Sequence, residues 1–211
     1  ADAWDDHPLS NLAIIRCYPW SHGKVALMGD AAHATVPFYG QGMNAGFEDC
    51  TVMNRLMHKH NHDWTAIFDE YSIERKPDGD ALQDLSLYNY LVMRDFVADP
   101  LFLLRKKIEA RFNEKYPEKW IPAYSMVTFS PHIRYSEALS KGKFQDKIMD
   151  EVMQLANIET NWNSDEVEQL IHVIAQNNKT PIIIGGGHNN AYPCIKGAAK
   201  GLYKAGLIPL A

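Results

Sequence analysis

The sequence has few cysteines, and the three present, Cys17, Cys50 and Cys194, are widely separated. An odd and scattered set does not build the disulfide framework of a small secreted protein, so we expect reduced thiols and a cytoplasmic protein. No apolar run of about 18 residues occurs, which argues against a membrane span. The opening residues, ADAWDDHPLS, lack the basic and apolar regions of a signal peptide.

An excess of positive charge is also missing. The chain has 21 Lys and Arg against 26 Asp and Glu, and its formal net charge is −5. A general nucleic-acid binder presents a basic face to phosphates, so we exclude nucleic acid as a partner. The 211 residues are enough to bury a core, as one large domain or two small ones.

Short apolar runs near the amino terminus predict strands. Residues 12–17 (LAIIRC) and 24–28 (KVALM) are bounded by turn residues, which is typical of buried strands. We expect a turn at 21–23. After Met43 the apolar residues recur at three- and four-residue steps and predict a helix with one buried face. The expected members of that face are Phe47, Cys50, Met53 and Leu56.

Helices are expected through the middle of the chain. A helix should follow Asp63, and we expect Pro77 to interrupt it, with a second helix over about 79–94. Further helices are predicted over 100–115 and 136–155, with an irregular, proline-containing region between them. The whole pattern predicts an α+β fold in which a few strands precede a mainly helical region.

The character of the sequence changes near residue 160. Asn163 and Glu166 have the spacing of a capping box. The stretch TPIIIGGGHNN then predicts a strand and a glycine turn, followed by another helix. One strand does not make a sheet, so we interpret this part as a short α/β fragment.

The chemistry is concentrated in VALMGDAAHATVPFYGQGMNAGFEDC, residues 25–50. The predicted strand delivers Asp30 near its carboxyl end, where a carboxylate can accept hydrogen bonds from sugar-type hydroxyls. Three glycines between residues 40 and 46 let the backbone approach a flat ligand closely. The helix that begins near Met43 offers unpaired N–H groups to an electron-rich ring edge. The alternative is a turn and a core helix without a ligand.

The segment GDAAHATVPFYGQGMNAGFEDC resembles the second flavin-binding motif of the class A FAD-dependent aromatic hydroxylases. DLSLYNYLVMRD at 84–95 and WIPAYSMVTFSPHIRYSEA at 120–138 are similar to the kynurenine-hydroxylating members of that family. The resemblance extends from near residue 1 to about residue 160. It implies hydroxylation of the aromatic ring of kynurenine with FAD, NADPH and dioxygen, a reaction that the cofactor carries.

The resemblance also assigns roles by position. Asp30 would bind the ribityl chain of FAD, while Met43 and Asn44 would present their backbone to the flavin. The complete cofactor-binding set is Asp30, Pro37, Gly42, Met43 and Asn44. The substrate-binding set is Phe38, Gln41, Asn89 and Tyr124, of which the last two would hold the amino-acid end of kynurenine. No side chain is expected to act as a catalytic nucleophile.

One part of the family pattern has no counterpart in this sequence. The family opens with a βαβ unit that carries GxGxxG and holds the ADP part of FAD, and no such motif occurs before residue 25. The resemblance therefore covers the carboxyl-terminal part of the family. We expect the missing amino-terminal flavin-binding half to be a partner, and the chain alone to be inactive.

A second resemblance lies near the carboxyl terminus. PIIIGGGHNNAY at 181–192 is similar to the first metal-binding motif of the arginase, agmatinase and formimidoylglutamase family. It implies that His188 is one ligand of a two-manganese (Mn²⁺) site. The DxHxD and DxD motifs of that family do not follow, and one imidazole cannot hold two divalent ions. A structural histidine is the alternative.

These observations predict three parts. Residues 1–60 would be a partial FAD-binding domain, residues 61–160 a helical region that covers the substrate, and residues 161–211 a ureohydrolase-like fragment. We place the seam between about 155 and 178. A natural fusion, a truncation or a misassembled reading frame would each give this pattern. A manganese ureohydrolase and an inactive fusion product remain the alternatives to a flavin hydroxylase.

Overall fold

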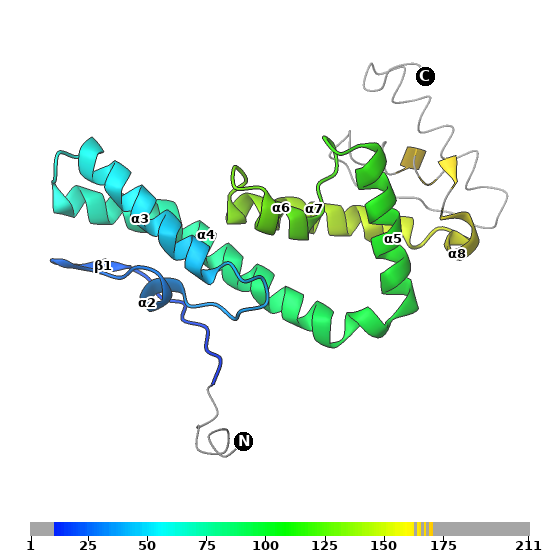
Figure 1. The fold of residues 1–211 in the computed structure, drawn as a ribbon, viewed down its shortest axis with the longest axis horizontal. Helices are drawn as coiled ribbons and strands as arrows, with labels where there is room; N and C mark the ends of the chain where they lie inside the picture. Colours follow the sequence, from blue (N-terminus) through cyan, green and yellow to red (C-terminus); the bar gives the residue numbers. More distant parts are fainter. Residues whose placement is uncertain (1–10, 163, 166, 168, 171–211) are drawn as a thin grey trace, which may run out of the picture. The chain divides into compact units, whose positions relative to one another are not determined.

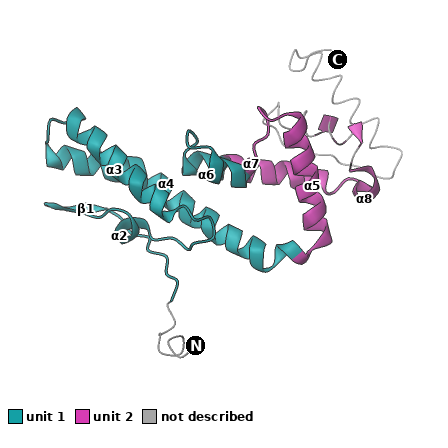
Figure 2. Ribbon diagram, viewed as in Figure 1, with its two compact units in different colours: residues 1–97, 123–140 teal, residues 98–122, 141–211 magenta. Residues whose placement is uncertain are grey.

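The computed structural model describes residues 11–162, 164, 165, 167, 169 and 170 (Figure 1). The chain forms two compact units, coloured separately in Figure 2. Unit 1 comprises residues 1–97 and 123–140, and unit 2 comprises residues 98–122 and 141–211. Most of the predicted α/β fragment, including His188, lies outside the described residues.

Unit 1 contains one small antiparallel sheet. Strand β1 (Ser21–His22) pairs with β2 (Val25–Ala26), with Ser21 opposite Ala26. Gly23 begins the turn between them and has a φ of +58°, a left-handed conformation that favours glycine. Among the described residues this is the only sheet, and helices dominate the rest, which confirms the mainly helical α+β class.

The strand predicted over residues 12–17 was wrong. These residues form no strand, and Leu12, Ile14 and Ile15 are exposed. The backbone of Ile15 is held differently, because its N–H donates to the carbonyl of Ala34 and its carbonyl accepts from the side chain of Gln83. The side chain of Gln83 and the carbonyl of Ala34 thus make the backbone hydrogen bonds that a neighbouring strand would have made.

The helices of unit 1 begin with α2 (Asp30–His33) and α3 (Gly42–Lys59). Helix α4 (Trp64–Arg94) follows, and the side chain of Asp63 caps it by accepting from the N–H groups of Thr65 and Ala66. The unit is completed by α6 (Ala123–Phe129) and the first residues of α7 (Tyr135–Val152). Helix α6 lies within the region that was expected to be irregular.

Pro77 does not interrupt α4, contrary to the expectation from the sequence. Proline removes one backbone donor, so the carbonyl of Ile73, four residues earlier, loses its helical partner. Ile73 is 67% exposed and Pro77 is exposed, so water can reach this side of the helix. The helix continues because the missing bond faces solvent.

Helix α3 buries a different face from the one expected. Phe47 is 63% exposed and Cys50 is exposed, whereas Met53 and Leu56 are buried as predicted. The buried face instead includes Asp49, whose side chain is fully buried. The apolar pattern therefore misplaced one edge of the buried face of α3, because the charged residue Asp49 is buried at that edge.

Asp49 is the centre of a buried charge network. Its Oδ2 accepts from the N–H of Gly29 at 2.9 Å and lies 2.6 Å from Nε2 of His33, and its Oδ1 accepts from Nε of Arg75 at 2.8 Å. Burial alone would raise the pKa of Asp49, but the hydrogen bonds from His33, Arg75 and Gly29 outweigh it and lower the pKa from 3.8 to about 2. The network joins α2, α3 and α4.

Gly79 allows α4 to approach α2 closely. A Cβ atom built on Gly79 would lie 3.0 Å from Cβ of His33 and 3.0 Å from Cη2 of Trp20. Trp20 is buried and belongs to the core of the unit. That core is formed by Trp20, Ala32, Met53, Leu56, Ile67 and Tyr71.

Unit 2 contains α5 (Pro100–Lys115), the later part of α7, and α8 (Ile158–Asn161). The bounds of α5 agree with the prediction, and those of α7 differ from it by a few residues. Arg105 joins α5 to α7 through Asp146 and Asp150. The core of the unit is formed by Ile108, Phe112, Trp120, Ile148, Met149, Val152, Ile158, Val167 and Leu170.

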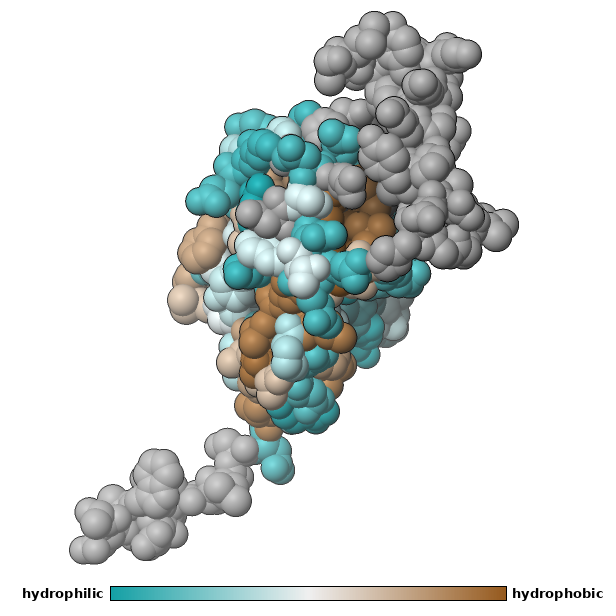
Figure 3. Space-filling model, turned by 90° about the vertical axis from the view of Figure 1, so that its right-hand side faces the viewer, coloured by the Kyte–Doolittle hydropathy of each residue, from teal (hydrophilic) through white to brown (hydrophobic). Residues whose placement is uncertain are grey.

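Some hydrophobic side chains remain at the surface. Hydrophobic and hydrophilic residues are interspersed on the face that Figure 3 shows. Within α5, Leu101 and Leu103 are about half exposed. Across the described part of the chain, no helix combines the length and the apolar character that crossing a membrane requires.

We predict that Gly79→Ala lowers the free energy of unfolding by about 1–3 kcal/mol, because the added methyl group overpacks the contact with His33 and Trp20. Gly46→Ala is the matched control, since its Cβ would meet only Gly29 Cα, at 3.9 Å. Alanine there should leave stability unchanged or raise it by up to about 1 kcal/mol through helix propensity. Urea unfolding followed by circular dichroism measures both. Equal stability of the two variants would contradict the close approach.

We also predict a specific acid sensitivity. The lowered pKa of Asp49 stabilises the fold above about pH 4, and this stabilisation is lost as the pH falls towards 2. Between pH 5 and pH 2 the wild-type chain should lose about 2 kcal/mol more unfolding free energy than Asp49→Asn does. Asp69→Asn, at an exposed position of α4, should follow the wild type. Parallel pH curves for the wild type and Asp49→Asn would refute the role of this carboxylate.

Candidate functional site

An open pocket of about 570 Å³ lies in unit 1. It is lined by the turn before α2, by the loop over residues 34–41 and by the first turns of α3. The lining residues are Gly29, Asp30, Thr35, Pro37, Gly40, Gly42, Met43 and Gly46. Four of the five predicted cofactor-binding residues thus surround one pocket.

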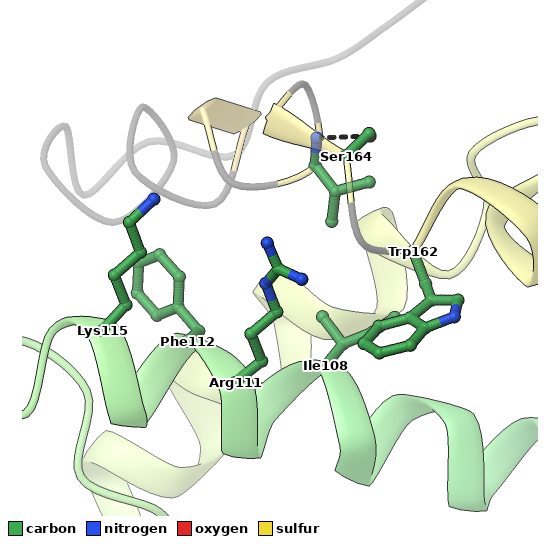
Figure 4. A pocket seen from close by; sticks show the side chains of 7 residues that line it. Ile108, Arg111, Phe112, Lys115, Trp162 and Ser164 are labelled. Atoms are coloured by element: carbon green, nitrogen blue, oxygen red, sulfur yellow. Dashed lines mark hydrogen bonds between the residues drawn. The ribbon is translucent and has the colours of Figure 1, made fainter.

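A second cavity, in unit 2, is much smaller. It has a volume of about 20 Å³, which is room for roughly one water molecule. Arg111 and Lys115 lie on one side of it and Trp162 on another (Figure 4). Its size excludes a ligand as large as a flavin or an amino acid, so the pocket of unit 1 is the candidate site.

Two glycines shape the rim of the pocket. Gly29 and Gly40 have φ values of +57° and +66°, and residues other than glycine rarely adopt this backbone conformation. The N–H of Gly29 donates to Asp49. The buried charge network therefore holds the turn that carries one edge of the pocket.

Asp30 is exposed at this edge and is the first residue of α2. The sequence placed it just after a strand that ends at residue 28, but β2 ends at Ala26 and a short connection follows. Asp30 therefore begins a helix instead of ending a strand. Its carboxylate still lines the pocket, where it can accept hydrogen bonds from a ligand.

The amino-terminal end of α3 forms the opposite side. Gln41 caps the helix through its backbone carbonyl, which accepts from the N–H of Ala45. Gly42 and Met43 line the pocket, and Met43 is 71% exposed. The first N–H groups of a helix have no partner within it, so this end favours an electron-rich or anionic group. Asn44 lies beside the pocket and donates its side-chain amide to Gln41 Oε1 at 2.8 Å.

Two of the predicted substrate-binding residues, Phe38 and Gln41, belong to the loop over residues 34–41, and the other two contact it. Asn89 on α4 donates to the carbonyl of Phe38 at 2.7 Å. The ring of Tyr124 on α6 stacks on Tyr39, with the ring centres 5.3 Å apart. Gln41 Oε1 also lies 3.3 Å from the hydroxyl of Tyr135. Unit 1 therefore brings these residues together around one loop, although none of the four lines the pocket itself.

Several residues at the site were not predicted. Gly29 and Thr35 line the pocket, and Tyr39 and Tyr135 contact its predicted members. The position of Gly29 immediately before Asp30 was a usable signal, because glycine often marks an unusual turn. Nothing in the local sequence connects Tyr135 to a glutamine 94 residues away.

The hydroxyl of Thr35 gives independent information about the pocket. Its Oγ1 is buried and has no hydrogen-bond partner among the described residues. A buried hydroxyl without a partner costs free energy, so such groups commonly serve a ligand or a water molecule. This oxygen is closed to solvent, so the glycine rim and the end of α3, rather than Thr35 Oγ1, define what the pocket can hold.

Comparison with known proteins gives two family matches. Residues 10–86 match the family described as FAD binding domain, and residues 117–210 match the arginase family. The first match includes every residue that lines the pocket of unit 1. The second covers the motif at 181–192 and begins well before it.

Curated relatives agree with the first match. The chain is 53% identical over 172 residues to a kynurenine 3-monooxygenase of Flavobacterium psychrophilum, covering 81% of this chain and 38% of the relative. It is 54% identical over 171 residues to that of Flavobacterium johnsoniae, with the same coverage. It is 46% identical over 148 residues to that of Anopheles gambiae, covering 70% of this chain and 30% of the relative.

The chain therefore spans well under half the length of the curated relatives that it matches. The matches confirm both resemblances that the sequence motifs indicated. Over its amino-terminal and central parts this chain resembles the kynurenine 3-monooxygenases of the FAD-dependent aromatic hydroxylases, and towards its carboxyl terminus it resembles the arginase family.

Proposed function

We propose that this chain supplies the flavin-contacting and substrate-covering part of an FAD- and NADPH-dependent hydroxylase that converts kynurenine to 3-hydroxykynurenine. The observation that carries the proposal is the pocket of about 570 Å³, which the residues of the flavin-like motif line. The similarity to proteins named kynurenine 3-monooxygenase supports the substrate. We place this activity in the cytoplasm.

The residues of the pocket fit a flavin. The glycine rim leaves room for a flat ring, and the carboxylate of Asp30 can accept from the hydroxyls of a ribityl chain. The exposed end of α3 offers N–H groups to an electron-rich ring edge. FAD, when bound, would supply the redox chemistry, while these residues hold and orient it.

Phe38, Asn89 and Tyr124 form the proposed substrate side. The carbonyl of Phe38 is fixed by Asn89, and the ring of Phe38 packs on Tyr90 with the ring centres 4.7 Å apart. An aromatic wall of this kind suits the aromatic ring of kynurenine and keeps water from the reacting atoms. Asn89 and Tyr124 carry donors suited to a carboxylate.

The chain would not act alone. The relatives are more than twice as long, and the sequence contains no GxGxxG before residue 25. We infer that an amino-terminal flavin-binding half completes the site, and that these 211 residues are inactive without it. This half would hold the ADP part of FAD at the N-terminus of its own helix.

The arginase-family match supports a second candidate function. It covers residues 117–210 and would make His188 a ligand of Mn²⁺. Neither a DxHxD nor a DxD motif, which would supply carboxylate oxygens to the metal, follows His188 in this sequence. A manganese ureohydrolase is therefore one alternative to the flavin hydroxylase, and an inactive fusion product is the other.

We predict that the purified chain quenches flavin fluorescence in a saturable titration with FAD, and that Asp30→Ala abolishes this binding. The loss is expected because the variant removes the acceptor for the ribityl hydroxyls. Asp69→Ala, at an exposed position of α4, removes the same charge away from the pocket lining and should bind like the wild type. Unchanged affinity in Asp30→Ala would refute the assigned role of Asp30.

In the intact hydroxylase, Asn89→Ala and Tyr124→Phe should each raise the KM for kynurenine by roughly 5- to 100-fold, as expected for lost hydrogen bonds to a charged group. Steady-state kinetics with NADPH consumption as the readout would measure this. Tyr18→Phe, at an exposed position, is a control for the loss of a tyrosine hydroxyl and should keep the KM unchanged. A wild-type KM in both substitutions at the site would remove these residues from the substrate-binding set.

A further inference from the structure

Tyr135 reaches the pocket loop from a distant part of the sequence. Its hydroxyl lies 3.3 Å from Oε1 of Gln41, and only 5% of Tyr135 is exposed. The same Oε1 accepts from the side-chain amide of Asn44 at 2.8 Å. Gln41 lies between Gly40 and Gly42, which both line the pocket. Two donors therefore converge on one oxygen beside the candidate site.

The neighbours of Tyr135 fix its position. Nε of Arg134 donates to Oδ2 of Asp78 at 2.9 Å. The N–H and the hydroxyl of Ser136 both donate to Oδ1 of Asp78, at 3.1 and 2.7 Å. Asp78 belongs to α4 and is buried. The residues on either side of Tyr135 are thus tied to one carboxylate of a long helix, which leaves the phenol ring little freedom.

The phenol is a donor at every physiological pH. Burial, helped by the negative charge of Glu48, raises the pKa of Tyr135 from 10.0 to about 12. The hydroxyl therefore keeps its proton and can donate to Gln41. Its role in the site is that of a neutral, fixed hydrogen-bond donor.

These contacts determine what Gln41 can offer to a ligand. A carboxamide has one acceptor oxygen and one NH₂ donor group, and here the oxygen already receives two donors. Turning over the Gln41 carboxamide alone would set its NH₂ against the NH₂ of Asn44. Within the described residues, Nε2 of Gln41 donates to no acceptor. The group that remains available is a donor.

We propose that Tyr135 is a positioning residue that fixes the carboxamide of Gln41, so that its NH₂ group is presented to an acceptor oxygen of the bound ligand, a carbonyl or a carboxylate. The identity of the ligand rests on the proposed function, whereas the fixing of Gln41 by Tyr135 rests on the contacts alone. The site would thus favour ligands that carry an oxygen at this point, because only these replace the hydrogen bond that the NH₂ group makes to water.

The first test uses the 211-residue chain without any ligand. The side-chain amide signals of Gln41 would be followed by ¹H–¹⁵N NMR and assigned by their loss in Gln41→Glu. In Tyr135→Phe these signals should shift and exchange faster with water, because one of the two donors on Oε1 is gone. Signals at unchanged positions, with unchanged exchange, would overturn the proposal.

The control variant is Tyr71→Phe. Tyr71 is another buried tyrosine of unit 1, and it packs in the core with Trp20 and Leu56. Its loss should leave the Gln41 signals in place. If Tyr135→Phe does not fold, Asn44→Ala provides a second route, since Asn44 is exposed and supplies the other donor. That variant should also shift the Gln41 signals, and unchanged signals would count against the arrangement.

The second test is a double-mutant cycle in the intact hydroxylase. Tyr135→Phe should raise the KM for kynurenine roughly two- to ten-fold, the effect of one neutral hydrogen bond, with a smaller change in kcat. In an enzyme that already carries Gln41→Ala, adding Tyr135→Phe should not raise the KM above that of Gln41→Ala alone. An equal rise in both backgrounds would overturn the proposal. A wild-type enzyme that does not hydroxylate kynurenine would refute the proposed function, while the NMR result would still decide the role of Tyr135.

Discussion

The ion pair between Asp49 and Arg75 is the interaction on which unit 1 depends. The two side chains are buried, one on α3 and one on α4, and their contact distance is 2.8 Å. Neither charge could remain in the interior alone, because the cost of removing an ion from water is several kcal/mol. The pair is sustained by further contacts from His33 and from the backbone of Gly29. Those additional contacts turn a local pair into a constraint on the backbone around the pocket.

Further buried polar contacts are made by Arg75 and Asp78 of α4. The guanidinium of Arg75 also reaches Asp78 and the carbonyl of Ala45. Asp78 in turn holds the segment that precedes and begins α7. The buried charges around Arg75 are thus joined in one connected set, and such a set favours a single arrangement of the groups in it. The pocket is formed by backbone that this set holds in place.

The sequence was a reliable guide where local signals decide the structure. Helix α5 begins at Pro100 after a capping Asp99, a combination that fixes the start of a helix without distant contacts. Most of the residues that line the pocket also belong to the predicted motif, because Asp30 and the glycines at 40, 42 and 46 lie within one short stretch. Short-range chemistry of this kind is visible in a single sequence.

Distant contacts explain where the sequence misled. The buried face of α3 was misplaced because Asp49 enters the core, and its partner Arg75 lies 26 residues away. Pro77 was expected to end a helix, but the carbonyl that it leaves unpaired faces water. Residues 12–17 resembled a buried strand, yet Gln83 holds their backbone. Two of these errors concern a distant partner and one concerns exposure to water, and pattern analysis identifies neither.

The link between Tyr135 and Gln41 has a consequence for the order of folding. Helices α3 and α4 can pack as soon as residues up to 94 have been synthesised, because the charge pair between them is local to that stretch. The fastening of the pocket loop must wait for a residue that leaves the ribosome 94 positions after its partner. During synthesis the helical pair can therefore form before the pocket loop is held in place, so the binding surface is completed after the helices that support it.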